Sequence, residues 1–135
     1  MNRPPVPRPT DAELAILRIL WERGSSTVRQ VHEILGRERQ AAYTTALKTL
    51  QIMTEKGLVE RDERDRTHIY RARLSEETTQ RQLVRDLLDR AFGGSSTKLV
   101  MQALATKRAS AEELRDIRKA IDEARNEREV RDDRD

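Results

Sequence analysis

Residues 40–56 read QAAYTTALKTLQIMTEK, and this stretch decides the fold. At helical spacing its apolar side chains gather on one arc, and hydroxyl groups and a lysine gather on the other. We expect a helix from about Gln40 to Lys56, ended by Gly57. The expected inward arc holds Tyr43, Ala46, Leu47, Leu50, Met53 and Thr54, and the outward arc holds Thr45, Lys48, Thr49 and Ile52, with Ala41 and Thr44 beside it.

Two helices are predicted before this one. Thr10-Asp-Ala-Glu13 has the pattern of a capping box, and Gly24 ends the helix that it opens. A second box, Thr27-Val-Arg-Gln30, opens a shorter helix, which we expect Gly36 to end. The expected buried stripes are Leu14, Leu17, Leu20 and Trp21 in the first helix, and Val28, Val31 and Leu35 in the second.

After Gly57 the spacing changes from helical to extended. Residues 58–62 and 67–73 predict the two strands of a hairpin, and residues 63–66 form its charged tip. The tip contains no glycine. Three short helices followed by a hairpin are the element order of a winged helix-turn-helix.

Helical spacing returns after Ser75 and predicts three more helices. Gly93-Gly94 ends the first of them, and Ser110-Ala-Glu-Glu113 is a capping box for the last. Narrow apolar stripes over 61 residues enclose little core, so we expect a second copy to cover them. The residues expected in this dimer interface are Leu83, Leu87, Leu99, Ala103, Leu114, Ile117 and Ile121.

The predicted fold class is mainly α. It is a winged helix-turn-helix, with three helices and a β-hairpin wing, followed by a three-helix dimerisation arm. Residues 1–9, which hold all four prolines, are predicted to be a disordered arm. Residues 10–74 are predicted to be the DNA-binding domain, residues 75–130 the helical dimerisation domain and residues 131–135 a frayed tail.

Composition excludes several classes of function. The 135 residues include no Cys, so disulfides and thiolate metal sites are excluded, and His32 and His68 lie too far apart in sequence to suggest a metal site. We expect no metal and no cofactor. Because no apolar run reaches the length of a membrane span and residues 1–9 lack a signal peptide's hydrophobic stretch, we expect a cytoplasmic protein. No catalytic motif is present, so we do not expect an enzyme.

The net charge of +3 is unevenly distributed. Residues 1–74 carry fourteen Lys or Arg against ten Asp or Glu, whereas residues 75–135 carry thirteen against fourteen. The excess positive charge therefore belongs to the N-terminal half and indicates a polyanionic partner for that half.

The outward arc of the 40–56 helix carries groups that can read DNA bases. Threonine offers a hydroxyl and a methyl group, and Lys48 can reach a guanine edge or a phosphate. A solvated helix face stays open as the alternative, although threonine is a poor helix former. Phosphate contacts are expected from arginines before this helix and at the hairpin tip, where a solvated loop is the alternative. The expected DNA contacts are Tyr43, Thr44, Thr45, Lys48, Thr49, Arg37, Arg39, Arg64 and Arg66, with Arg29 a weaker candidate.

Five stretches together resemble the BlaI/MecI penicillinase-repressor family. The resemblance covers about residues 10–125 and is strongest up to Leu74. It implies a homodimer that represses transcription at palindromic promoter sites on double-stranded DNA, as at antibiotic-resistance-type genes. It also implies base contacts from residues 42–49, which include Ala42. The stretches are DAELAILRILW at 11–21, TVRQV at 27–31, AYTT at 42–45, KGLV at 56–59 and RTHIY at 66–70.

The resemblance also implies a way of relieving repression. Antibiotic-responsive members of the family are cleaved at an Asn-Phe bond in the middle helix of the arm, after a signal from a membrane sensor-protease. The matching bond here joins Gln102 to Ala103, which departs from that pattern. Either the protease partner differs or the repressor is released in another way. The absence of Cys argues against the copper sensing of related repressors.

Two other classes of function stay open. A small-molecule-sensing regulator of the multidrug kind needs an apolar, aromatic pocket, and Phe92 is the only aromatic residue in residues 75–135. A winged-helix interaction module without a role on DNA is disfavoured by the basic N-terminal half. We therefore predict a homodimeric DNA-binding repressor.

Overall fold

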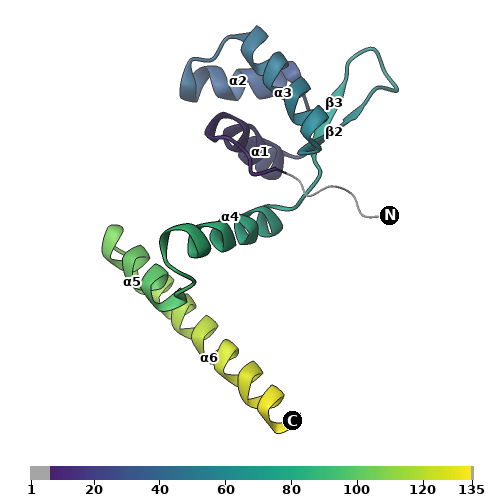
Figure 1. Ribbon diagram of the computed structural model, residues 1–135. Coiled ribbons are helices and arrows are strands. Elements are labelled where there is room, and N and C mark those ends of the chain that lie inside the picture. Colours follow the sequence, from purple (N-terminus) through teal and green to yellow (C-terminus); the bar gives the residue numbers. More distant parts are fainter. Residues whose placement is uncertain (1–6, 135) are drawn as a thin grey trace. The chain divides into compact units, whose positions relative to one another are not determined.

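The computed structural model describes residues 7–134 (Figure 1). By its contacts the chain divides into two compact units, one up to Leu87 and one from Leu88 onward. The predicted winged helix-turn-helix followed by three helices is confirmed. The elements are α1 (Asp11–Arg23), β1 (Ser26–Thr27), α2 (Val28–Arg39), α3 (Tyr43–Lys56), β2 (Val59–Asp62), β3 (Ile69–Ala72), α4 (Glu76–Ala91), α5 (Ser96–Thr106) and α6 (Ala111–Arg134).

Both predicted capping boxes at the start of the chain are present. In α1 the Thr10 hydroxyl accepts the Glu13 N–H at 3.2 Å, and the Glu13 carboxylate accepts the Thr10 N–H at 2.9 Å. Thr27 and Gln30 form the same reciprocal pair in α2, at 3.2 and 2.9 Å. These bonds satisfy amides that a helix start leaves without partners, which explains why both helices begin where they do.

The boundary between α2 and α3 differs from the prediction. The helix α2 continues past Gly36 to Arg39, and Gln40 ends it in the left-handed conformation, with φ of 53°. The predicted stop was wrong because glycine inside a helix costs only about 1 kcal/mol, which surrounding packing can offset. The helix α3 then begins at Tyr43 instead of Gln40, with Ala42 as its N-cap.

The sheet has three strands, not the two predicted. Strand β3 lies in the middle: it pairs antiparallel with β1, where Tyr70 faces Ser26, and with β2, where Tyr70 faces Arg61. The missed strand, β1, has two residues and directly precedes α2. A strand this short shows no alternation that sequence reasoning could detect.

The wing turns without a glycine because Asp62 holds the turn. Its carboxylate oxygen Oδ1 accepts the backbone N–H of Arg64 at 3.0 Å. A carboxylate that bonds the amide two residues ahead mimics a backbone turn. Figure 1 shows the β2–β3 hairpin extending from the sheet.

The core of the first unit lies between α1, α2, α3 and the sheet. On α3 the inward arc is confirmed for Ala46, Leu50 and Met53, whereas Leu47 is only half-buried and Tyr43 is 45% exposed. The prediction that Tyr43 lies inward was wrong, because the first turn of α3 extends past the core. The largest fully buried side chains are Tyr70, Ile16, Leu50, Met53, Val31 and Val59.

The buried stripe of α1 is also wider than predicted. Ile16 and Ile19 are buried, although the predicted stripe omits them, while Leu14 and Trp21 are only half-buried. Trp21 instead uses its indole N–H to bond the Leu74 carbonyl at 2.9 Å. The helix α1 therefore packs on two sides, and a narrow stripe underestimates how much of it is covered.

A partly buried ion pair joins α1 to the end of α3. Lys56 Nζ lies 2.9 Å from Glu13 Oε2, and Glu13 is 3% exposed. Burial alone would raise the pKa of Glu13, but hydrogen bonds from Lys56 and Thr10 outweigh it, so that the pKa is lowered from 4.5. The capping carboxylate thus also fixes how α1 and α3 pack.

The helix α4 begins within the first unit. Thr79 is 4% exposed, and Arg8 Nη1 lies 2.5 Å from Asp86 Oδ2. Arg8 belongs to the arm predicted to be disordered, and residues 1–6 of that arm lie outside the described residues. As predicted, α4 ends before the two glycines: the Gly94 N–H bonds the Leu88 carbonyl at 2.8 Å.

The last helix is longer than expected. The capping box is present, since the Glu113 N–H bonds Ser110 Oγ at 3.0 Å. We expect fraying from about Arg128 and a frayed tail over residues 131–135, yet α6 continues to Arg134; Asp135 lies outside the described residues. Opposite charges four residues apart, as at Glu127 and Arg131, favour the helix at this end.

Candidate nucleic-acid interface

The outward arc of α3 is exposed, as the helical spacing predicts. Thr44, Thr45 and Lys48 are exposed and Ile52 is 37% exposed, whereas Leu50 on the other side is fully buried. The hydroxyls of Thr44 and Thr45 bond no other described residue. This face therefore presents hydroxyl, methyl and ammonium groups that suit a DNA groove.

Thr49 differs from its two neighbours on α3. Its hydroxyl donates to the Thr45 carbonyl at 2.8 Å, and the residue is only partly exposed. A threonine that bonds back to its own helix has used its proton. Thr49 can still offer its methyl group and an accepting oxygen.

The helix α3 starts without a side-chain cap. Ala42 occupies the N-cap and is exposed, and it has no side-chain oxygen to accept an amide. The first amides of a helix lack partners within it and carry the positive end of the helix dipole. The start of α3 can therefore donate backbone N–H groups to an anion such as a DNA phosphate.

A groove of about 490 Å³ lies beside this helix start. Arg29 from α2, Tyr43 from α3 and Arg66 from the wing all line it, although the two arginines lie 37 positions apart in the sequence. Two guanidinium groups beside an uncapped helix start suit a phosphate. The other lining residues are Thr27, Val28, Leu47, Thr67, His68 and Tyr70.

Tyr43 is held at this groove by α2. Its ring meets the ring of His32 edge-on, with 5.6 Å between the ring centroids and 80° between the planes. Such an edge-to-face contact is favourable for two aromatic rings. The contact gives His32 a structural role, and the described residues contain no cluster of His, Cys, Asp and Glu that could hold a metal.

Most wing arginines are paired with wing carboxylates. Arg64 forms a two-pronged pair with Asp62, with a shortest distance of 2.7 Å, and this hydrogen bonding lowers the pKa of Asp62 to about 2. The remaining pairs are Arg71 with Glu60 at 2.6 Å and Arg61 with Glu63.

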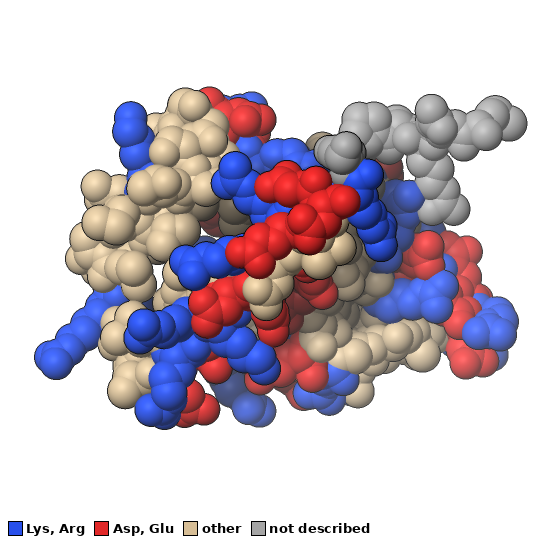
Figure 2. All heavy atoms as spheres, turned by 90° about the horizontal axis from the view of Figure 1, so that it is seen from below, with Lys and Arg blue, Asp and Glu red and all other residues tan. Residues whose placement is uncertain are grey.

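Arg66 is the exception in the wing. It is exposed and forms no ion pair or hydrogen bond with any other residue that the structure describes. Figure 2 shows Lys and Arg intermixed with Asp and Glu on the face that it draws. An arginine without a carboxylate partner has its whole charge available for an external anion.

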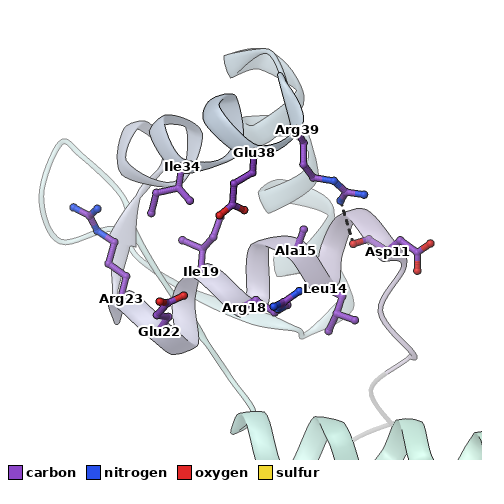
Figure 3. Close-up of a pocket in the computed structure, with 10 residues that line it drawn as sticks. All are labelled: Asp11, Leu14, Ala15, Arg18, Ile19, Glu22, Arg23, Ile34, Glu38 and Arg39. Carbon is purple, nitrogen blue, oxygen red and sulfur yellow. Dashed lines mark hydrogen bonds between the residues drawn. The ribbon is translucent and has the colours of Figure 1, made fainter. Parts of the chain in front are cut away.

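Arg37 and Arg39 lie elsewhere than predicted. Both belong to the last turn of α2, because that helix continues past Gly36. Arg39 turns toward α1, where its guanidinium donates to the Asp11 carbonyl at 3.4 Å (Figure 3). It lines a separate hollow of about 670 Å³ between α1 and α2, so it is not among the residues that line the groove beside α3.

The residues expected at a dimer interface have substantial exposure. Leu87 on α4 is 45% exposed, and Leu114 and Ile121 on α6 are 48% and 51% exposed. The other four are partly or fully exposed: Leu83, Leu99, Ala103 and Ile117. No described residue among the seven is buried.

The bond between Gln102 and Ala103 lies inside α5. Both residues are exposed, and the Gln102 carbonyl accepts the Thr106 hydroxyl at 2.6 Å. This peptide bond is therefore helical.

A separate observation concerns the membrane: none of the described helices is both long and apolar enough to span one.

Sequence reasoning missed six of the nine residues that line the groove, including Thr67 and His68. These two follow the charged tip and carry no charge pattern of their own. Only the pairing of β3 with β1 brings them to the start of α2. The weaker candidate Arg29 was detectable, because it is an arginine in the first turn of a capped helix.

Known proteins share both the sequence and the fold. A family model described as Penicillinase repressor matches residues 9–123. Transcriptional regulator BlaI of Mycobacterium tuberculosis is 34% identical over 114 residues, which are 84% of this chain and 82% of that protein. The Penicillinase repressor of Bacillus licheniformis is 22% identical over 121 residues, 90% of this chain and 94% of that protein.

A solved structure adds a likeness of fold. The structure of an hsRosR-S4 complex superposes with a TM-score of 0.50 at 18% identity, over 87% of this chain and 90% of that chain. The resemblance seen in the sequence motifs is confirmed by the match of the family model. The chain belongs to the penicillinase repressor family.

Proposed function

We propose that this protein is a sequence-specific, DNA-binding transcriptional repressor that acts as a homodimer on palindromic promoter sites. One observation carries the proposal: the exposed face of α3 at Thr44, Thr45 and Lys48 lies on the helix whose uncapped start lines a basic groove. A major groove admits an α-helix, and phosphates flank it. The relatives' names, a transcriptional regulator and a penicillinase repressor, support the same role.

The proposed contacts divide into two kinds. Thr44, Thr45 and Lys48 read base edges in the major groove, with Ala42, Tyr43 and Thr49 beside them at the helix start and flank. Arg66 holds a phosphate together with Arg29. Further phosphate contacts are proposed for Arg64, Arg37 and Arg39. Contacts to phosphate position the protein, and contacts to bases select the sequence.

Self-association is supported by the apolar side chains left exposed on α4, α5 and α6. Burying exposed leucine and isoleucine against a second copy removes apolar surface from water. A two-fold dimer presents two copies of α3, so its DNA site consists of two half-sites in inverted order, one helical turn or a multiple apart.

Relief of repression by proteolysis is part of the proposal. The bond between Gln102 and Ala103 is exposed, but it lies inside α5. A membrane sensor-protease system would act on it only after this helix opens, because proteases bind extended backbone. A DNA partner implies a cytoplasmic location, and a repressor of this kind is not an enzyme and needs no cofactor.

Titration onto DNA tests the proposal. The full chain is titrated onto its own upstream DNA and onto random DNA of equal length at several salt concentrations. We expect tighter binding to the upstream DNA at every salt concentration. Equal affinity for the two DNAs would contradict sequence-specific repression.

The described residues favour no small-molecule sensor. The hollow of about 670 Å³ between α1 and α2 is lined mostly by charged side chains and by no aromatic residue (Figure 3). Drug-sized ligands need a mainly apolar, aromatic lining.

A further inference from the structure

We propose that Asp62 limits the affinity of the wing for DNA by holding Arg64 in an intramolecular pair. This inference rests on the proposed DNA-binding function and concerns how much of the wing's charge reaches the phosphates. It assigns Asp62 as a residue that sets affinity without touching DNA.

The geometry of the pair supports this role. Arg64 Nε lies 3.1 Å from both carboxylate oxygens of Asp62, and Nη2 lies 2.7 Å from Oδ2. The arginine is otherwise free: its side chain is 89% exposed. A guanidinium bound by two prongs has its fork occupied, and the same fork is what binds a phosphate.

The ion pair between Asp62 and Arg64 can be removed without removing the hydrogen bond that shapes the turn. Asp62 also accepts the Arg64 backbone N–H at 3.0 Å, which shapes the wing tip. An asparagine at this position keeps an oxygen for that bond but loses the charge that attracts the guanidinium. Asp62→Asn therefore releases Arg64 while the tip retains its turn.

The chain offers a matched control within the same loop. Asp65 is an exposed carboxylate of the tip that pairs with no described residue. Asp65→Asn changes the charge of the tip by the same amount but releases no arginine. Any difference between the two variants therefore reports the release of Arg64 and not the general loss of negative charge.

The experiment measures the affinity of the full-length wild type and variants for upstream and random DNA from 50 to 200 mM salt. One added phosphate contact steepens the slope of log affinity against log salt by about 0.9. When the salt concentration rises fourfold, the affinity of the Asp62→Asn variant should therefore fall by about 3.5-fold more than the affinity of the wild type. At the lowest salt concentration we expect the affinity for both DNAs to rise by up to about fivefold. The gain is no larger because breaking an exposed ion pair changes a binding equilibrium only slightly.

A double-mutant cycle completes the test. Arg64→Ala should lower affinity more in the Asp62→Asn background than in the wild type, because only there is the guanidinium free. Asp62→Ser, which also keeps a side-chain oxygen, should repeat the gain, and circular dichroism checks that each variant is folded.

The outcomes distinguish this inference from the proposed function. A salt slope for Asp62→Asn equal to that of Asp65→Asn, or a gain that persists without Arg64, overturns the role of Asp62 while specific binding by the wild type leaves the proposed function intact. A wild type that does not discriminate between the two DNAs contradicts the proposed function itself.

Discussion

Glu13 links capping, packing and pH at the scale of one residue. Its carboxylate caps α1 through the Thr10 N–H and receives the ammonium of Lys56 at 2.9 Å, although the residue is 3% exposed. These bonds lower the pKa of Glu13 in the folded protein. They therefore stabilise the fold at pH values above the pKa that Glu13 has in the unfolded chain, which is near 4.5. That contribution is lost as the pH falls through the lowered pKa.

The first prediction concerns this carboxylate. Glu13→Gln should lower the free energy of unfolding at pH 7 by about 1–3 kcal/mol, because it removes a charged partner from a buried bond. Its stability should also fall less steeply than that of the wild type below pH 4.5. Urea unfolding at several pH values measures both effects. Glu55→Gln, at an exposed position on α3, is the control, and equal pH profiles for wild type and Glu13→Gln would contradict the assignment.

Gln40 gives a second prediction at this scale. It is the one described non-glycine residue with a positive φ, and a left-handed side chain costs about 1–2 kcal/mol. Gln40→Gly should therefore raise the free energy of unfolding by about 0.5–1 kcal/mol. The same change at Gln51, inside α3, should lower it by about 1 kcal/mol. If thermal unfolding shifts both variants in the same direction, the turn between α2 and α3 differs from the one described.

At the scale of the element, α3 combines a buried face with an exposed one. Met53 and Leu50 fix the helix in the core, while Thr45 and Lys48 face solvent. Since the buried side sets the rotation of the helix about its axis, packing determines which side chains are presented outward.

This arrangement predicts that substitutions in α3 and in the wing change DNA binding in different ways. Thr45→Ala or Lys48→Ala should reduce the preference for upstream over random DNA, by about 1–3 kcal/mol for a lost base contact. Arg66→Ala should instead weaken binding to both DNAs and flatten the salt slope by about 0.9. Lys107→Ala, which removes a charge just after α5, is the control. Unchanged discrimination in both α3 variants would mean that another element reads the sequence.

Sequence reasoning predicted faces better than boundaries. The two arcs of α3 follow from helical spacing, and the capping boxes of α1 and α2 follow from local hydrogen bonding, so both were predictable. The end of α2 was not, since packing of the whole helix outweighs the cost of Gly36. The groove was only partly predictable, because the pairing of β3 with β1 joins segments that lie far apart along the chain.

At the scale of the whole molecule, the two units differ in how well they cover their own apolar side chains. Within residues 7–134, all thirteen buried hydrophobic residues belong to the first unit, while Leu114 and Ile121 in the second stay about half exposed. A second copy of the chain is the proposed cover for these residues.

A substitution within the expected dimer interface tests the proposed dimer. Ile121→Asp should shift the protein from dimer to monomer at micromolar concentration, because a charge cannot be buried without a partner. Sedimentation measures this shift, and binding to palindromic DNA should weaken in parallel. Val130→Asp introduces the same charge at an exposed apolar residue that is not among the expected dimer-interface residues, and it should leave the dimer intact. A wild-type monomer at micromolar concentration would contradict the dimer.

The helical Gln102–Ala103 bond has a consequence for timing. If release depends on cutting this bond, then the fraction of time that α5 spends locally unwound sets an upper limit on how fast repression ends. In that case, substitutions at the exposed alanines of α5 or at the Ser95 cap would lengthen or shorten the delay without altering the protease or the promoter.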